Sequence, residues 1–217
     1  MNCSMTMPAL LGAALTMVAA TQASASVVDL YAGESVGLSG ITSAEDPTLA
    51  GVVAIDYSQG FEVGDPAGAR LTGTLISRVV MRLDTGEIDF SWRLRDLESE
   101  TNLISSIVLS GFDGWDVGVE WRVDGLGDVG PAFASRTEDS DSIGFLFDAP
   151  YLHASSDSKY MFARTHAMSY DLIGTARINL VTGESVVLST FAPTVPTPGG
   201  LALLGVAGMG VARRRRR

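Results

Sequence analysis

Cysteine and lysine are almost missing from this chain of 217 residues. Cys3 is the only cysteine, and it lies before the apolar run at residues 9–20 rather than directly after it. A lipid anchor on this cysteine is therefore not expected. The rest of the chain has no thiol, which excludes disulfides, thiol catalysis and cysteine metal sites there.

Positive charge is also scarce outside the last five residues. The formal net charge is −10, from 15 basic and 25 acidic residues, and residues 213–217 supply five of the basic ones. All 25 acids lie between Asp29 and Glu184, so the middle of the chain carries 10 − 25 = −15, with Lys159 as its only lysine. Such a surface repels nucleic acid and anionic lipid, so we expect no nucleic-acid partner. It suits a soluble extracellular protein.

The N-terminal 25 residues have the pattern of a secretion signal. The 12 apolar residues 9–20 are long enough for a signal core and short for a membrane span. Ala23 and Ala25 are the small residues expected at a cleavage site, which predicts cleavage before Ser26. The preceding segment lacks Lys and Arg, which departs from the usual signal pattern and leaves the true start codon open. The alternative is a buried helix of the domain, but the sequence becomes strand-like at Val27.

The C-terminal end has three parts in a fixed order. A proline-rich motif comes first, then an apolar stretch at 199–212, then a cluster of arginines. Fourteen helical residues span about 21 Å, which is short for a hydrocarbon core of about 30 Å. By the positive-inside rule the arginines stay in the cytoplasm and the domain lies outside. The motif residues are Val195, Pro196, Thr197, Pro198 and Gly199, and the arginines are Arg213, Arg214, Arg215, Arg216 and Arg217.

This tail resembles the PEP-CTERM sorting signal of exosortase substrates. Exosortases are membrane proteases of bacteria that make extracellular polysaccharide. The family's Pro-Glu-Pro corresponds to Pro196-Thr197-Pro198, with Thr197 in place of Glu. The resemblance implies a single-pass membrane intermediate, cleavage near the motif, and release or attachment to the envelope. A generic C-terminal anchor without processing is the alternative.

The middle of the chain has the two-residue period of β-strands. In 87–95, EIDFSWRLR, the apolar residues Ile88, Phe90, Trp92 and Leu94 alternate strictly with polar ones, which predicts a half-buried strand. With the turn at 84–86, residues 71–97 predict a long hairpin. Other strands are expected at 52–57, 104–112, 117–123, 143–147, 159–165, 170–180 and 185–191.

These strands predict an all-β fold, an antiparallel β-sandwich that is jelly-roll-like. A signal helix and a C-terminal hydrophobic helix are expected to flank it. The predicted organisation is 1–25 signal peptide, 26–192 acidic β-sandwich domain and 193–217 sorting tail. Stretches such as RTHAMSYDLIGTARI, at 164–178, also resemble a domain that recurs in exported proteins with this tail. That resemblance implies fold and location, and no activity.

No catalytic constellation is evident, and no catalytic residue is predicted. His153 and His166 have no metal-ligand spacing, and the zinc-protease, nucleophile-elbow and phosphate-loop motifs are missing. A Ser-His-Asp triad remains open, because triads assemble across a fold. Glu87 and Asp89 lie on one strand face about 7 Å apart, a separation that glycosidase carboxylates can have. An acidic chain produces such pairs by chance.

Two binding chemistries, calcium coordination and sugar stacking, remain open beside catalysis. Asp139 and Asp141 are the candidates for a calcium site, although an EF-hand loop fails because Ile143 and Pro150 fall where oxygen ligands are required. No cofactor is expected, and calcium remains open, with contributions from other loops at Asp113, Asp116, Asp124 and Asp128.

The three tryptophans are the candidates for stacking against a sugar. Trp92 and Trp121 lie on the apolar faces of their strands, so core packing is expected for both. Trp115 follows Gly114 in a loop and is the better ligand candidate.

The sequence therefore predicts an exported, non-enzymatic surface or extracellular-matrix protein. Its expected partners are the secretion machinery, an exosortase-like membrane protease, the membrane through the C-terminal helix, and extracellular polysaccharide. The alternatives are a carbohydrate- or calcium-binding module and, third, a secreted hydrolase.

Overall fold

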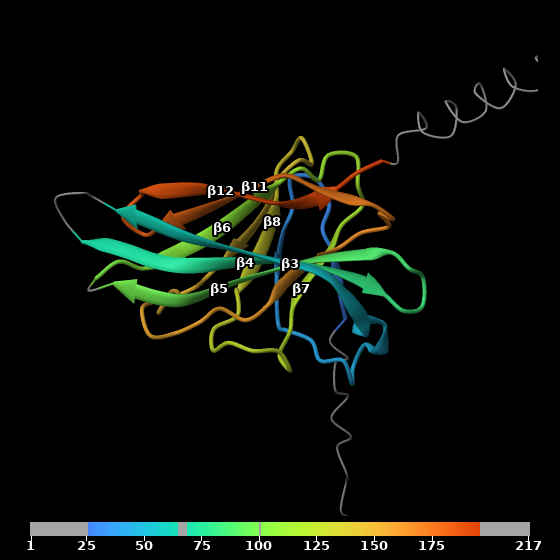
Figure 1. Cartoon of the computed structure of the whole chain (residues 1–217), viewed down its shortest axis with the longest axis horizontal. Helices are drawn as coiled ribbons and strands as arrows, with labels where there is room; N and C mark the ends of the chain where they lie inside the picture. Colours follow the sequence, from blue (N-terminus) through green and yellow to red (C-terminus); the bar gives the residue numbers. More distant parts are fainter. Residues whose placement is uncertain (1–25, 65–68, 100, 196–217) are drawn as a thin grey trace, which may run out of the picture.

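The computed structural model describes residues 26–64, 69–99 and 101–195, and these residues form two β-sheets packed face to face (Figure 1). Each sheet has six strands and every strand pair is antiparallel. The first, called the β3 sheet, has the order β1-β7-β10-β5-β4-β3, and the second, the β12 sheet, has the order β12-β11-β6-β9-β8-β2. The predicted antiparallel β-sandwich is thus confirmed.

The strand bounds match most of the predicted ranges. In the β3 sheet they are β1 (Val28–Asp29), β3 (Gly51–Gly64), β4 (Arg70–Arg82), β5 (Ile88–Ser99), β7 (Gly118–Trp121) and β10 (Met161–Arg164). In the β12 sheet they are β2 (Ser35–Gly37), β6 (Ile104–Ser110), β8 (Phe133–Arg136), β9 (Ile143–Leu146), β11 (Tyr170–Leu180) and β12 (Ser185–Pro193). A short 3-10 helix, η1 (Pro47–Leu49), lies between β2 and β3.

The hairpin predicted at 71–97 is formed by β4 and β5. Leu75 pairs with Leu94 and Met81 with Ile88, and the turn between the strands contains Gly86 at φ 75°. Glycine is favoured there because this backbone conformation crowds any Cβ. The turn residues at 84–86 therefore fix the register of the two long strands.

The core lies between the two sheets and is rich in aromatic rings. Phe112 packs edge-to-face against Phe90 and Trp92, with ring centroids 5.7 and 6.0 Å apart. The Trp92 indole N–H donates a 2.6 Å hydrogen bond to the hydroxyl of Thr190, which is fully buried on β12. This bond satisfies a polar group that would otherwise be costly in the core.

The outer face of β5 differs from the half-buried strand that its alternation predicts. The polar side of the strand is buried: the exposed fractions of Asp89, Ser91 and Arg93 are only 5, 8 and 9%. Segments from other parts of the chain cover them: Ile41 and Leu49 pack with Phe162 of β10 in a second, smaller apolar cluster. The prediction was wrong on this point because Asp89 forms ion pairs with arginines of the neighbouring strands β4 and β10, and Arg93 forms one with Asp157 of a covering loop, instead of facing water.

Candidate functional site

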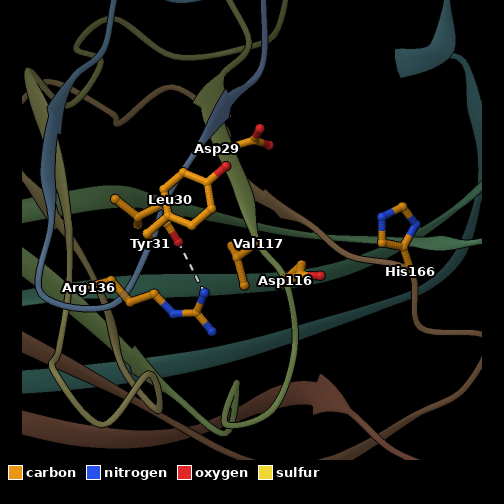
Figure 2. Close-up of a pocket in the computed structure, with 7 residues that line it drawn as sticks. All are labelled: Asp29, Leu30, Tyr31, Asp116, Val117, Arg136 and His166. Atoms are coloured by element: carbon orange, nitrogen blue, oxygen red, sulfur yellow. Dashed lines mark hydrogen bonds between the residues drawn. The ribbon is translucent and has the colours of Figure 1, made fainter.

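Three adjoining depressions lie where β1, the loop before β7 and the turn after β8 meet, and Figure 2 shows the residues that line one of them. Their volumes are about 270, 270 and 510 Å³, and Asp116 lines all three. We call their union the Tyr31 trough. It is lined by Val27, Asp29, Leu30, Tyr31, Ala32, Asp113, Gly114, Trp115, Asp116, Val117, Gly118, Arg136, Ser140, Arg164, Thr165 and His166.

Arg136, at the end of β8, holds together the three segments that form the trough. Its guanidinium donates to the carbonyl oxygens of Leu30 (3.0 Å), Phe112 (3.2 Å), Trp115 (2.6 Å) and Ser140 (3.0 and 3.1 Å). The side chain is buried, and burial lowers the pKa of the guanidinium. Because its N–H groups are directed at backbone carbonyls, Arg136 acts as a structural tie beneath the trough.

Two aromatic side chains border the trough. Tyr31 is 62% exposed, whereas Trp115 is half-buried and packs against the main core. The turn that carries Tyr31 is fixed by a hydrogen bond from the Glu34 N–H to the Tyr31 carbonyl (3.1 Å) and by the Gly33 N–H, which donates to Thr137 (3.3 Å). Both rings are therefore attached to well-anchored backbone.

Three carboxylates of the trough lack hydrogen-bond partners among the described residues, and the charge of Arg136 acts on two of them, Asp113 and Asp116. Asp29, Asp113 and Asp116 are exposed, and no hydrogen bond or ion pair reaches their side chains from the residues that the structure describes. Most acids elsewhere accept such bonds; Glu120, for example, accepts from the backbone N–H groups of Ser39 (3.1 Å) and Gly40 (2.9 Å). The trough thus concentrates acceptors that are open to an external donor.

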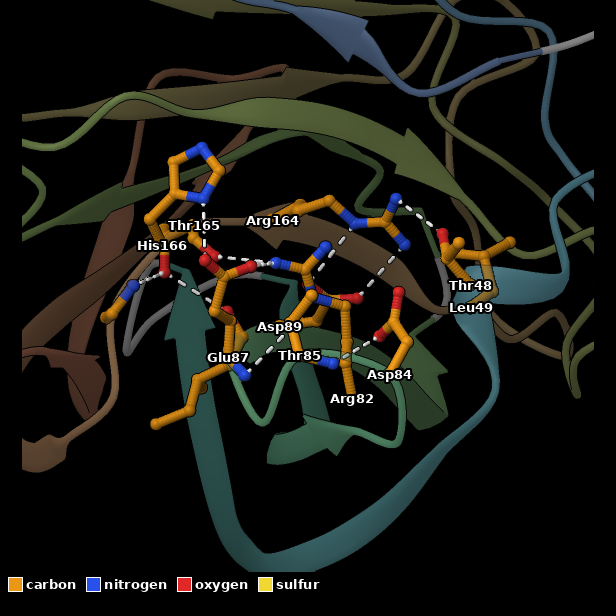
Figure 3. Close-up of polar contacts among 12 residues, drawn as sticks. Thr48, Leu49, Arg82, Asp84, Thr85, Glu87, Asp89, Arg164, Thr165 and His166 are labelled. Carbon is orange, nitrogen blue, oxygen red and sulfur yellow. Dashed lines mark hydrogen bonds and ion pairs between the residues drawn. The ribbon is translucent and has the colours of Figure 1, made fainter.

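A buried ion network lies beside the trough, on the outer face of the β3 sheet (Figure 3). Asp89 lies between Arg164, whose Nε is 3.4 Å from the Asp89 Oδ1, and Arg82, whose Nε is 3.7 Å from the same oxygen. Burial raises the pKa of Asp89, and the two guanidinium groups oppose that effect. Glu87 pairs with Arg82, and its Oε1 accepts a hydrogen bond from the His166 Nδ1–H at 2.9 Å. Glu87 and Asp89 are therefore tied into ion pairs, and Asp89 is shielded from solvent.

A further depression of about 310 Å³ lies over the outer face of the β3 sheet, and its charges are paired. Arg78 forms a bidentate ion pair with Asp56 and lies 4.7 Å from the centre of the Tyr160 ring. Arg122 donates to Asp124 at 2.8 and 3.1 Å, and this arginine, together with Ser43, lowers the pKa of Asp124 despite partial burial. These groups stabilise the covering loops and leave little for a ligand.

The histidines have local roles. His153 Nδ1 is 2.8 Å from the hydroxyl of Ser156, which also donates to the His153 carbonyl at 2.8 Å within one turn. Ser156 is only 7% exposed, and within the described part of the chain no carboxylate contacts the His153 ring. A catalytic triad needs a serine that substrate can reach and a carboxylate that orients the imidazole. This pair meets neither requirement.

The tryptophans lie where the sequence predicts. Trp92 is 1% exposed in the core, and Trp121 is half-buried and packs against the core. Trp115 lies in the loop between β6 and β7 and lines the trough.

The acidic pair proposed for calcium serves the turn after β8. Asp139 accepts from the Thr137 hydroxyl (2.6 Å) and from the Asp141 N–H (3.1 Å), and the first of these bonds contributes most to lowering the pKa of Asp139. Asp141 accepts from the Gly111 N–H at 3.1 Å. Over the described ranges, no group of three or more His, Cys, Asp or Glu side chains is arranged to hold a metal ion.

Most residues of the two predicted targeting ends lie outside the described residues. Ser26, after the predicted signal cleavage point, and Val195, at the start of the sorting motif, are both exposed. The signal helix, the C-terminal helix and these residues fall outside: Ala23, Ala25, Pro196, Thr197, Pro198, Gly199, Arg213, Arg214, Arg215, Arg216 and Arg217. In the ranges that are described, no helix has the length and apolar character needed to cross a bilayer.

Sequence reasoning missed three residues of the trough: Asp29, Tyr31 and Arg136. Asp29 ends β1, a strand of two residues that is too short for a periodic signal, and Tyr31 follows this strand. Arg136 ends β8, which lies much later in the chain. The position of Trp115 beside Gly114, and the acids Asp113 and Asp116 beside them, were the signals that pointed to this loop.

No protein-family model, no curated protein and no solved structure matches this chain. No relative therefore assigns a role to any of these residues. The arguments for function come from the chain's own chemistry and geometry.

Proposed function

We propose that this chain is an exported, non-enzymatic protein of the cell surface or extracellular matrix. The secretion machinery delivers it, and an exosortase-like membrane protease processes it at the C-terminal tail. The order of parts at the two ends carries this proposal: an apolar run with Ala23 and Ala25 at one end, and prolines, an apolar stretch and five arginines at the other.

The extent of the fold supports the proposal. All twelve described strands lie between Val28 and Pro193. Cleavage before Ser26 and within the motif at 195–199 would therefore remove no described strand. The domain can keep its strand pairing in the processed form.

The environment of the candidate catalytic groups supports a non-enzymatic role. Asp89 is buried between two arginines, Glu87 is ion-paired, and the Ser156 hydroxyl is buried in a local turn. A general acid, base or nucleophile must reach substrate to act. The acidic surface fits a protein that stays soluble outside the cell and associates with polysaccharide through specific contacts instead of bulk charge.

The decisive experiment identifies both mature ends of the protein. The full chain is expressed in a host that has an exosortase, and the surface and medium fractions are analysed by mass spectrometry. We expect an N-terminus at Ser26 and a C-terminus within 195–199, without the arginines. Surface-located protein that keeps Arg217 would contradict processing.

Three variants sharpen this experiment. Ala25→Leu places a large residue at the signal cleavage site, so we expect the signal to be retained. Pro196→Ala combined with Pro198→Ala should accumulate as a membrane-bound, unprocessed form. Thr197→Glu restores the residue that the resembled family has, and should be processed at least as fast as the natural chain. An intact C-terminal tail on the natural chain and on both tail variants would argue for a generic anchor without processing.

A further inference from the structure

We propose that the Tyr31 trough binds a sugar chain that is rich in hydroxyl groups and carries no acidic groups. A ligand site goes beyond the sorting role proposed above, because it gives the delivered domain a binding function. The inference depends on the fold and not on the tail, so either proposal can fail alone.

The two aromatic side chains carry the first part of the argument. Tyr31 and Trp115 line the same depression of about 510 Å³, one mostly exposed and one half-buried. Partly exposed Tyr and Trp offer large apolar faces at a small cost in side-chain entropy, and the C–H face of a sugar ring fits such a surface. Packing against the core accounts for the buried part of Trp115, whereas the Tyr31 ring is mostly exposed beside the depression.

The anchoring of these rings is the second part. Arg136 donates to the Trp115 carbonyl, and the Trp115 N–H donates to the Phe112 carbonyl at 3.2 Å. The Tyr31 turn is fixed to the turn after β8 through Gly33. Because the backbone on both sides is fixed before a ligand arrives, little conformational entropy is lost on binding.

The carboxylates define the polar chemistry of the ligand. Asp113 and Asp116 flank Trp115 in the chain, and Asp29 lines the adjoining depressions. Within the described residues these acids accept no hydrogen bond, so their oxygens are available to hydroxyl or ammonium donors, which form strong charge-assisted bonds. They do not gather into a metal-ligand group, which matches donors spread along a sugar chain.

Charge also excludes one class of sugar. The Arg136 guanidinium donates to backbone carbonyls, and its single charge offsets only part of the charge of Asp29, Asp113 and Asp116, so the trough is net negative. Acidic sugars such as uronates would be repelled. Neutral sugars and amino sugars share the required donor groups, and the experiment separates these two sources.

The test uses the full chain, exported and purified in its processed form. Neutral gluco- and manno-oligosaccharides, glucosamine oligomers and oligouronates are presented on an array, and the best probe is then titrated by calorimetry. We expect binding to a neutral or an amino-sugar probe and none to oligouronates. No binding to any probe, or a preference for oligouronates, would overturn the proposal.

Matched variants locate the binding. Tyr31→Ala and Asp116→Asn should each weaken binding of the best probe by about tenfold or more, since both remove contacts at the centre of the site. The controls are Phe133→Ala, an aromatic residue that is 46% exposed on β8, and Glu98→Gln, an exposed acid on β5. Equal losses in controls and trough variants would contradict the assignment.

Folding and sorting are followed in the same samples. Tyr31 and Asp116 are exposed, so their variants should unfold at the same urea concentration as the natural chain, and binding losses then report the site. Glycan binding by Trp115→Ala is interpreted only if this variant also unfolds at the same urea concentration as the natural chain. The mature ends of the trough variants should stay unchanged while glycan binding is lost. That result would show that the binding site and the sorting role are independent.

Discussion

Replacing Arg136 by methionine should lower the free energy of unfolding by about 3 kcal/mol at pH 7. Of the carbonyl oxygens that the guanidinium reaches, those of Leu30 and Phe112 lie in buried surroundings. A buried carbonyl left without a donor costs about 1–3 kcal/mol, so the two together cost about 2–6 kcal/mol. Methionine keeps much of the side-chain volume and removes the cost of burying a charge, which places the net effect in the lower half of that range. The carbonyls of Trp115 and Ser140 are partly exposed, and water can replace the arginine there.

Urea unfolding followed by tryptophan fluorescence measures this loss. With a slope of about 2–3 kcal/mol per molar urea for a domain of this size, the midpoint should fall by about 1–1.5 M. The matched control is Arg177→Met on β11. The side chain of this arginine is exposed and forms no hydrogen bond or ion pair with a described residue. A surface change of this kind should stay within about 0.5 kcal/mol of the natural chain.

Equal behaviour of the two variants would contradict this prediction. If Arg136→Met unfolded at the same urea concentration as Arg177→Met, the carbonyls beneath the trough would be hydrated rather than dependent on the guanidinium. The trough would then not be held together by this side chain.

The other predictions concern single buried or paired groups. Asp124→Asn should cost about 1 kcal/mol at pH 7. Because the folded-state pKa of Asp124 is lowered, its stabilisation is complete above about pH 4 and is lost progressively as the pH falls toward the folded value, so the difference between the urea midpoints of the two proteins should be smaller at pH 3 than at pH 7. Thr190→Val removes the acceptor of the Trp92 N–H and the partner of Ser77, and should cost about 2 kcal/mol by thermal unfolding; a change in melting temperature below about 2 °C would contradict it. Glu120→Gln puts an amide where a buried carboxylate accepts three backbone N–H groups, and should cost about 2 kcal/mol in urea, whereas a neutral effect would show that one oxygen suffices.

The sequence predicted the long strands well and the covered surfaces badly. The hairpin of β4 and β5 was found because a strict two-residue period and the turn at 84–86 agree. The same alternation gave no sign that Asp89 and Arg93 are buried. A polar residue at such a position can face water or form a buried ion pair, and the sequence pattern is the same in both cases. Strands β1, β2 and β8 were missed because two to four residues carry almost no periodic signal.

The candidate site was predictable only in part for a related reason. Trp115 could be placed in a loop by its neighbour Gly114. Its relation to Tyr31 and Arg136 depends on segments that lie far apart in the chain and meet only when the sheets are paired. Neither composition nor local pattern encodes that meeting.

The pairing order of the strands has a consequence for how the chain becomes native. β3, β4 and β5 are consecutive strands that pair as a meander. In contrast, β1 pairs with β7 and β2 pairs with β8, and these partners follow much later in the chain. A polypeptide that emerges from a pore N-terminus first would therefore present its earliest strands long before their partners arrive. Non-local pairing of this kind slows folding, so the meander should assemble first and the N-terminal strands should dock last. In a chain delivered in this way, β1 and β2 would stay unpaired until residues 118–136 have emerged.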